Sequence, residues 1–150
     1  MSLQTDIKGE MILAMKAKDQ VKLTVIRGLM SAFTNELVAK GRRPDEALSD
    51  DEALTVITRA VKQRKDSIEQ FTNGGRADLA ESEQAELNVL QSYLPAQMSR
   101  EEVETFVKAK IASEAPTKDK AGQFTGSVMK ELKGKVDGTL VKEVVDALLA

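Results

Sequence analysis

Apolar residues recur every third or fourth position along almost the whole chain, and this spacing constrains the fold more than any other feature. Such a period places apolar side chains along one face of an α-helix, whereas a half-buried strand needs strict alternation. No segment alternates for long enough to predict a strand. We therefore expect an all-α protein.

Residues that start or stop helices divide this pattern into seven expected helices. The stretch "SDDE" at residues 49–52 has the spacing of a capping box, in which Ser49 and Glu52 satisfy each other's backbone amides, so a helix should begin there. Asp137 is expected to cap the last helix. The first six helices are expected to end near Lys18, Gly41, Thr72, Ser92, Pro116 and Gly134, and the last to start near Gly138.

A break in this pattern at Leu94–Pro95 divides the chain. Proline cannot continue a helix, and it pushes the residue before it toward extended geometry. A second capping-box spacing, formed by Ser99 and Glu102, follows directly. We expect an N-terminal four-helix domain over residues 1–94 and a small C-terminal three-helix domain over residues 95–150.

The absence of two residue types narrows the chemistry that this chain can perform. It contains no cysteine and no histidine, which excludes disulfides, thiol nucleophiles, the usual zinc ligand sets and triads that need histidine. General acid–base chemistry would fall to carboxylates, lysines or the single tyrosine, Tyr93. We expect no metal, no cofactor and no catalysis by the chain alone.

The location of the protein is also expected from the sequence. No apolar run approaches the roughly 20 residues that a membrane-spanning helix needs. The first residues, "MSLQTDIKGEM", lack the basic-then-apolar order of a secretory signal. We expect a cytoplasmic protein that does not interact with membranes.

Three sequence blocks, and the spacing between them, resemble the GatB/YqeY family along the whole chain. The blocks are "VKQRKDSIEQFTNGGRADLAESEQAEL" at residues 61–87, "LQSYLPAQMSREE" at 90–102 and "GQFTGSVMKELKGKVDGTLVKEVV" at 122–145. The resemblance implies a freestanding helical protein similar to the tail region of the B subunit of the tRNA-dependent Asp/Glu amidotransferase. In that enzyme the tail contacts the tRNA body, and other domains perform catalysis.

Three functions follow from this resemblance and from the composition. The first is a non-catalytic helical module associated with tRNA. The alternative is a protein-interaction adaptor without RNA binding, which the net charge of −2 and the 3% of aromatic residues favour. A weaker alternative is carbon–nitrogen ligase activity with glutamine as amido-N-donor, a label that the family would pass on although its freestanding members lack the glutaminase and ATP-using modules.

Two clusters of basic residues are candidate RNA contacts, because phosphate recognition needs only correctly placed Lys and Arg. For both clusters, the ordinary alternative is a solvated helix face. The tail resemblance favours the C-terminal cluster, which consists of Lys118, Lys120, Lys130, Lys133 and Lys135. The second basic patch consists of Lys62, Lys65 and Arg76.

One arginine interrupts an apolar helix stripe. Arg64 follows Ile57 and Val61 on the expected core face of the third helix. Glu83 and Glu86 interrupt the stripe of the fourth helix in the same way, and a hairpin between these helices would place them opposite Arg64. We expect a structural ion pair here and not a catalytic carboxylate pair, because buried charges must be paired to be tolerated.

Overall fold

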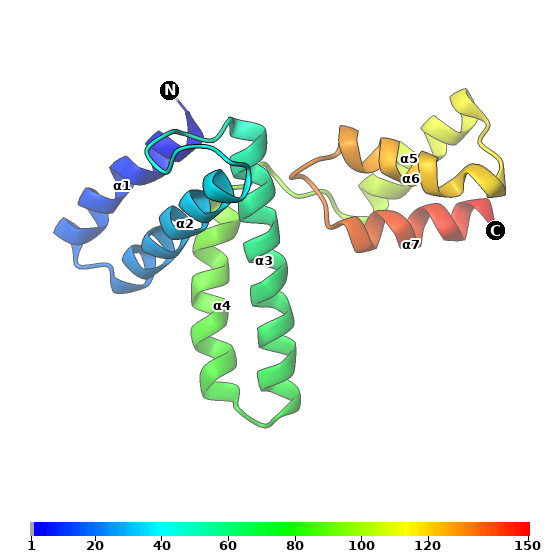
Figure 1. Ribbon diagram of the computed structural model, residues 1–150. Helices are drawn as coiled ribbons and strands as arrows, with labels where there is room; N and C mark the ends of the chain where they lie inside the picture. Colours follow the sequence, from blue (N-terminus) through cyan, green and yellow to red (C-terminus); the bar gives the residue numbers. More distant parts are fainter. Residues whose placement is uncertain (1) are drawn as a thin grey trace. The chain divides into compact units, whose positions relative to one another are not determined.

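The computed structural model describes residues 2–150, and every regular element in that range is a helix (Figure 1). The expectation of an all-α protein is confirmed. The helices are α1 (Leu3–Ala17), α2 (Gln20–Ala39), α3 (Asp50–Asn73), α4 (Ala77–Ser92), α5 (Arg100–Glu114), α6 (Ala121–Glu131) and α7 (Gly138–Leu149), with a short 3₁₀ turn, η1 (Lys118–Lys120), before α6.

The chain divides into two compact units, of which the first extends to Leu94 and the second begins at Pro95. The first unit contains α1 to α4, and the second contains α5 to α7 with η1. Each unit has a hydrophobic core of its own, and the two cores share no residue. Whether each unit is a domain that folds alone stays a prediction.

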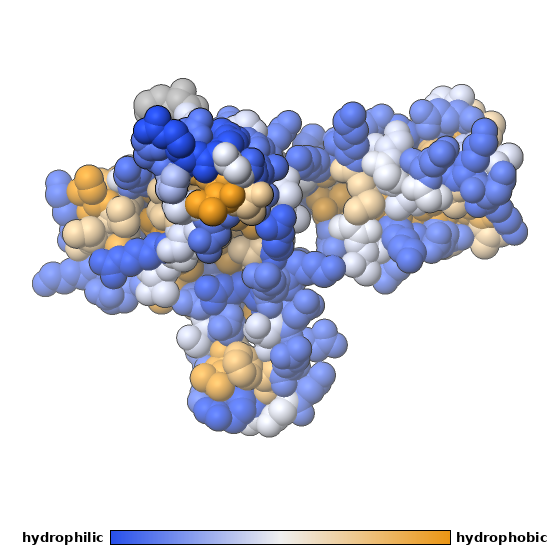
Figure 2. All heavy atoms as spheres, viewed as in Figure 1, coloured by the Kyte–Doolittle hydropathy of each residue, from blue (hydrophilic) through white to orange (hydrophobic). Residues whose placement is uncertain are grey.

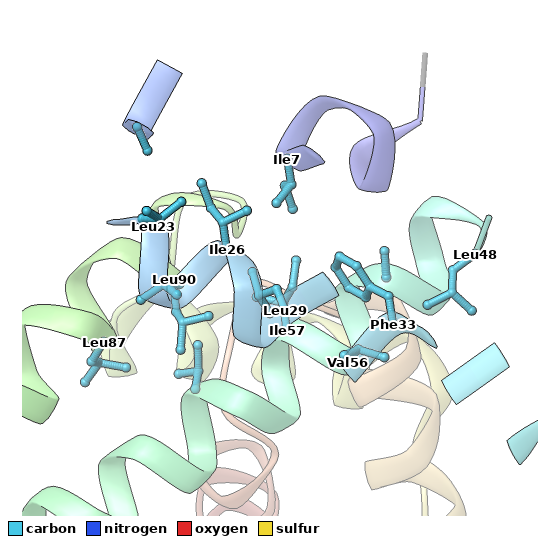
Figure 3. Packing of buried hydrophobic residues seen from close by; sticks show 14 of the residues in the cluster. Ile7, Leu23, Ile26, Leu29, Phe33, Leu48, Val56, Ile57, Leu87 and Leu90 are labelled. Atoms are coloured by element: carbon cyan, nitrogen blue, oxygen red, sulfur yellow. The ribbon is translucent and has the colours of Figure 1, made fainter. Parts of the chain in front are cut away.

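Two helical hairpins, α1 with α2 and α3 with α4, build the first unit (Figure 1). Ile26 and Leu29 of α2 meet Ile57 of α3 in its core (Figure 3). The hairpin of α3 and α4 turns at Gly75, whose φ of 74° lies in the left-handed region that glycine adopts most readily. The capping box at the start of α3 is present as the sequence predicts, with both reciprocal hydrogen bonds between Ser49 and Glu52.

The apolar stripe of α1 ends one turn earlier than its spacing indicates. Leu3, Ile7 and Met11 face the core, but Met15 is 53% exposed and Ala14 is buried in its place. Each four-residue step turns about 40° beyond a full rotation of the helix, so a run of such steps leaves the buried face. Met15 therefore adds an apolar side chain to the solvent-exposed surface of α1.

The second unit packs α5, α6 and α7 around one core, which includes Val107, Val128 and Val144. The segment before α5 is fastened to the turn between α6 and α7. The Gln97 side-chain amide donates to the Gly134 carbonyl at 2.8 Å, and the Met98 N–H donates to the Lys135 carbonyl at 2.8 Å. The "YLPAQ" and "LKGK" stretches, far apart in the sequence, therefore meet at this point.

The turn after α6 has the glycine and the cap that the sequence predicts. Gly134 has a φ of 79°, and the Asp137 carboxylate accepts a hydrogen bond from the Thr139 N–H at 2.9 Å at the start of α7. Across residues 2–150, each helix is too short or too polar to cross a membrane.

Candidate nucleic-acid interface

The five C-terminal candidate lysines lie in two groups at opposite ends of α6. Lys118 and Lys120 belong to η1, directly before α6. Lys130 lies in its last turn, and Lys133 and Lys135 follow in the turn toward α7. A helix of 11 residues separates the groups, which is roughly 15 Å at the standard rise per residue. The structure does not gather the five lysines into one cluster, and it places Lys133 just after the helix on which the sequence puts it.

All five lysine side chains are exposed. The ion pairs that the structure shows within residues 95–150 use Arg100 or Lys110 as the cation. The charges of the five candidate lysines are therefore available to a partner molecule. Exposed ammonium groups without a carboxylate partner are the groups that release counterions when they meet phosphates.

Lys110 neutralises the Glu131 carboxylate at this end of α6. Glu131 directly follows Lys130 in the sequence and would offset it. The Lys110 ammonium group, which reaches across from α5, forms ion pairs with Glu131 and with Glu114. The Lys110 side chain is only 9% exposed, and its hydrogen bond to Glu131 raises the pKa of Lys110 above its ordinary value. Lys130 and Lys133 are thereby left without a competing carboxylate.

Two glycines leave the backbone of α6 bare between the two lysine groups. Gly122 and Gly126 are exposed and lie four residues apart, followed by Lys130 after four more, so the three share one face. A Cβ atom added at either glycine would meet no other atom within 4 Å. The helix backbone is open to solvent at these two positions, and an extended polyanion that contacts the lysines at both ends of α6 can approach it closely there. The four-residue spacing of Gly122, Gly126 and Lys130 is the sequence signal for this face.

The acidic residues of the second unit lie mainly on the other two helices. Residues 95–150 contain nine basic and nine acidic side chains, so the unit has no net charge of its own. Six of the acidic side chains belong to α5 and α7, and α6 contains only one, Glu131. The remaining two, Asp119 and Asp137, lie in η1 and in the turn after α6. The segment from η1 to that turn therefore has five basic and three acidic side chains, and this local excess of positive charge in a neutral unit attracts polyanions.

The three residues of the N-terminal basic patch are spread over α3 and the turn before α4. Lys62 and Lys65 are exposed on α3. Arg76 lies beyond the end of that helix, next to the start of α4, and its guanidinium group is 3.2 Å from the Asp78 carboxylate. This hydrogen bond lowers the pKa of Asp78, so Arg76 already has a counterion. The structure does not bring these three residues together as one anion site.

Arg64 contacts both carboxylates of α4. Its Nη1 atom lies 2.9 Å from Glu83 Oε2 and also donates to Glu86. The side chain of Arg64 is 27% exposed, so the cluster lies at the edge of the core and not within it. It borders an open cavity of about 340 Å³ that Gly28, Ala60 and other residues line. Because Arg64 occupies both carboxylates, they are not a free acid–base pair.

The single tyrosine is poorly suited to act as a base. Tyr93 is partly buried at the end of α4. Burial raises the pKa of Tyr93, and the neighbouring Glu10 carboxylate raises it further. Its phenol therefore stays protonated at neutral pH. In residues 2–150, no group of three or more Asp and Glu side chains is arranged to hold a metal ion.

Comparison with known proteins finds a matching family and relatives that align over most of the chain. It matches the family described as "Yqey-like protein" over residues 4–149. It is 33% identical, over 98% of its own length and 78% of the relative, to "Altered inheritance of mitochondria protein 41, mitochondrial" of Pyrenophora tritici-repentis. It is 34% identical, over 87% of its length and 68% of the relative, to the protein of the same name in Saccharomyces cerevisiae.

The names of these relatives contradict the expected cytoplasmic location. Both relatives are called mitochondrial, and the expectation is wrong. It rested on the lack of a secretory signal at the start of the chain. That criterion does not address mitochondrial import, whose signals are amphipathic and rich in Arg and Ser instead of basic and then apolar.

Proposed function

Because the chain belongs to the Yqey-like protein family, we propose that it is a non-catalytic helical module that holds the phosphate backbone of tRNA along α6. The observation that carries this proposal is the arrangement around that helix. Two groups of unpaired, exposed lysines lie at the ends of a face that Gly122 and Gly126 keep bare. The choice of tRNA rests on the resemblance to the amidotransferase tail.

The mechanism is charge neutralisation. Lysines that contact phosphates release the cations condensed on RNA, so the logarithm of the binding constant falls linearly with the logarithm of the salt concentration. Phosphate contacts position a nucleic acid but do not read its bases. The second unit has few aromatic side chains, Phe106 and Phe124, and both belong to its core, so base stacking has no platform there. Binding should depend strongly on salt and weakly on sequence.

The test compares two double variants that remove the same charge from the second unit. Lys130→Gln with Lys133→Gln removes two proposed phosphate contacts. Lys108→Gln with Lys142→Gln removes two exposed lysines from α5 and α7 instead. The binding of labelled tRNA is followed by fluorescence anisotropy over a series of salt concentrations.

We expect the first variant to reduce the slope of log K against log salt by about 1.5, since each lost contact contributes roughly 0.7 to 0.9. The control variant should leave the slope close to that of the wild type. An equal reduction in both variants would mean that only overall charge matters, and the assignment to α6 would be wrong. If wild-type protein shows no affinity for tRNA at low salt, the adaptor function becomes the better proposal.

A further inference from the structure

Most of the exposed large apolar side chains come from one stretch of the first unit. Six large hydrophobic residues are exposed in the described chain, and four of them lie between positions 12 and 21. Ile12 and Leu13 are 57% and 62% exposed on the outer side of α1. Figure 2 shows apolar residues on the surface over this helix. Single exposed apolar residues are normal, whereas a cluster of them marks an interaction surface.

A glycine lies next to this cluster without any use inside the chain. Gly9 is in the middle of α1, where glycine weakens a helix relative to alanine. A Cβ atom at Gly9 would meet nothing within 4 Å. No packing within the chain therefore requires a glycine at this position. The missing side chain at Gly9, next to the exposed Ile12 and Leu13, leaves room for a second helix to pack closely against α1.

Opposite charges lie at the two ends of the same face. Asp6 and Lys16 are exposed, and at 100° per residue both lie on the outer half of the helix together with Gly9 and Leu13. The ion pair that α1 forms with α2 uses Glu10 and not these two residues. The order along the face is therefore acidic, small, large apolar, basic.

We propose that α1 is the interface of a homodimer in which the α1 helices of two copies pack antiparallel on these outer faces. With a two-fold axis near residue 11, each Leu13 lies over Gly9 of the second copy, and each Asp6 lies opposite Lys16 of the second copy. Both contacts occur twice, as a two-fold symmetric interface requires. The face is complementary to itself in shape and in charge.

The charge and the area of this face define what it fits. An anionic lipid surface would be repelled by Asp6 at one end of the face, whereas a second copy supplies a lysine at that point. One helix face buries less than the roughly 800 Å² per partner of a standard stable interface. The dimer is therefore weak, and it forms as protein concentration rises.

The decisive experiment uses two single charge reversals, measured by sedimentation equilibrium over a wide concentration range. Asp6→Lys brings four lysines together in a homodimer, and Lys16→Asp brings four aspartates together. Each variant alone should raise the dimer dissociation constant at least tenfold. An equimolar mixture should dimerise about as well as the wild type, because both contacts are again between opposite charges.

A matched pair of apolar substitutions tests the centre of the face. Leu13→Asp should abolish dimerisation, while Val38→Asp, at a residue of the same unit that is 55% exposed on α2, should not change it. Thermal melting by circular dichroism verifies that each variant remains folded. A wild-type protein that stays monomeric at the highest concentration would overturn the proposal. So would a mixture of the charge variants that associates no better than each alone, or a monomer that binds anionic vesicles.

Discussion

A single carboxylate secures the start of α3. Glu52 Oε1 accepts hydrogen bonds from the Ser49 N–H and from Arg42 Nη1, both at 2.9 Å. The backbone hydrogen bond from Ser49, followed by that from Arg42, lowers the pKa of Glu52 from 4.5 to about 2. Folding therefore stabilises the ionised form of this side chain.

This shift predicts a loss of stability in acid. Between pH 4.5 and pH 2, the unfolded chain takes up a proton at Glu52 that the folded chain does not, so the contribution of Glu52 is fully present above this range and disappears toward its lower end. Melting temperatures of wild-type protein and Glu52→Gln should differ at neutral pH and converge as the pH falls toward 2. A difference that stays constant down to the lowest pH would show that Glu52 acts only through its shape.

Arg64 illustrates how exposure sets the strength of an ion pair. The side chains of Arg64, Glu83 and Glu86 are 27%, 25% and 17% exposed, so water screens them in part. Arg64→Ala should reduce the free energy of unfolding by roughly 1 to 2 kcal/mol, between the values for exposed and fully buried pairs. Urea unfolding measures this, with Lys62→Ala as an exposed control expected to change stability by less than about 0.5 kcal/mol. Equal effects of the two variants would mean that solvent screens the Arg64 cluster completely.

At the scale of the helix, α6 permits a test that separates folding from binding. Gly126→Ala adds a methyl group that meets no other atom within 4 Å, and alanine favours a helix interior by up to about 1 kcal/mol over glycine. The variant should therefore melt at a higher temperature. A larger side chain, as in Gly126→Leu, should still fold but weaken tRNA binding severalfold, because it holds the RNA backbone away from α6. Undiminished tRNA affinity in Gly126→Leu would exclude the bare face from the interface.

The helices themselves could be predicted from the sequence because their signals are local. Ser49 with Glu52 at the start of α3, and Asp137 at the start of α7, act within three residues, and all are present in the structure. Lys110 and Glu131 are 21 residues apart, and nothing in either neighbourhood indicates that they pair. The exposure of Met15 is likewise not encoded locally, since it depends on where the other helices lie.

At the scale of the whole molecule, the two proposed interfaces lie in different units. The proposed RNA contacts all lie after Pro95, and the proposed dimer interface lies in α1 of the first unit. Each unit contains a complete core, although a domain as small as the second buries only a modest share of its surface and is marginally stable. If the units are domains, each function should survive without the other unit.

Fragments of the chain test this separation directly. Residues 95–150 alone should show helical circular dichroism, melt cooperatively and keep the salt-dependent affinity for tRNA, because the core around Val107 and Val128 and the lysines of α6 are all included. Residues 1–94 alone should dimerise and bind no tRNA. A folded C-terminal fragment without tRNA affinity would show that the proposed interface on α6 is insufficient. An unfolded one would instead show that the second unit needs the first for stability, in which case the lysine variants of the full chain decide the question of binding.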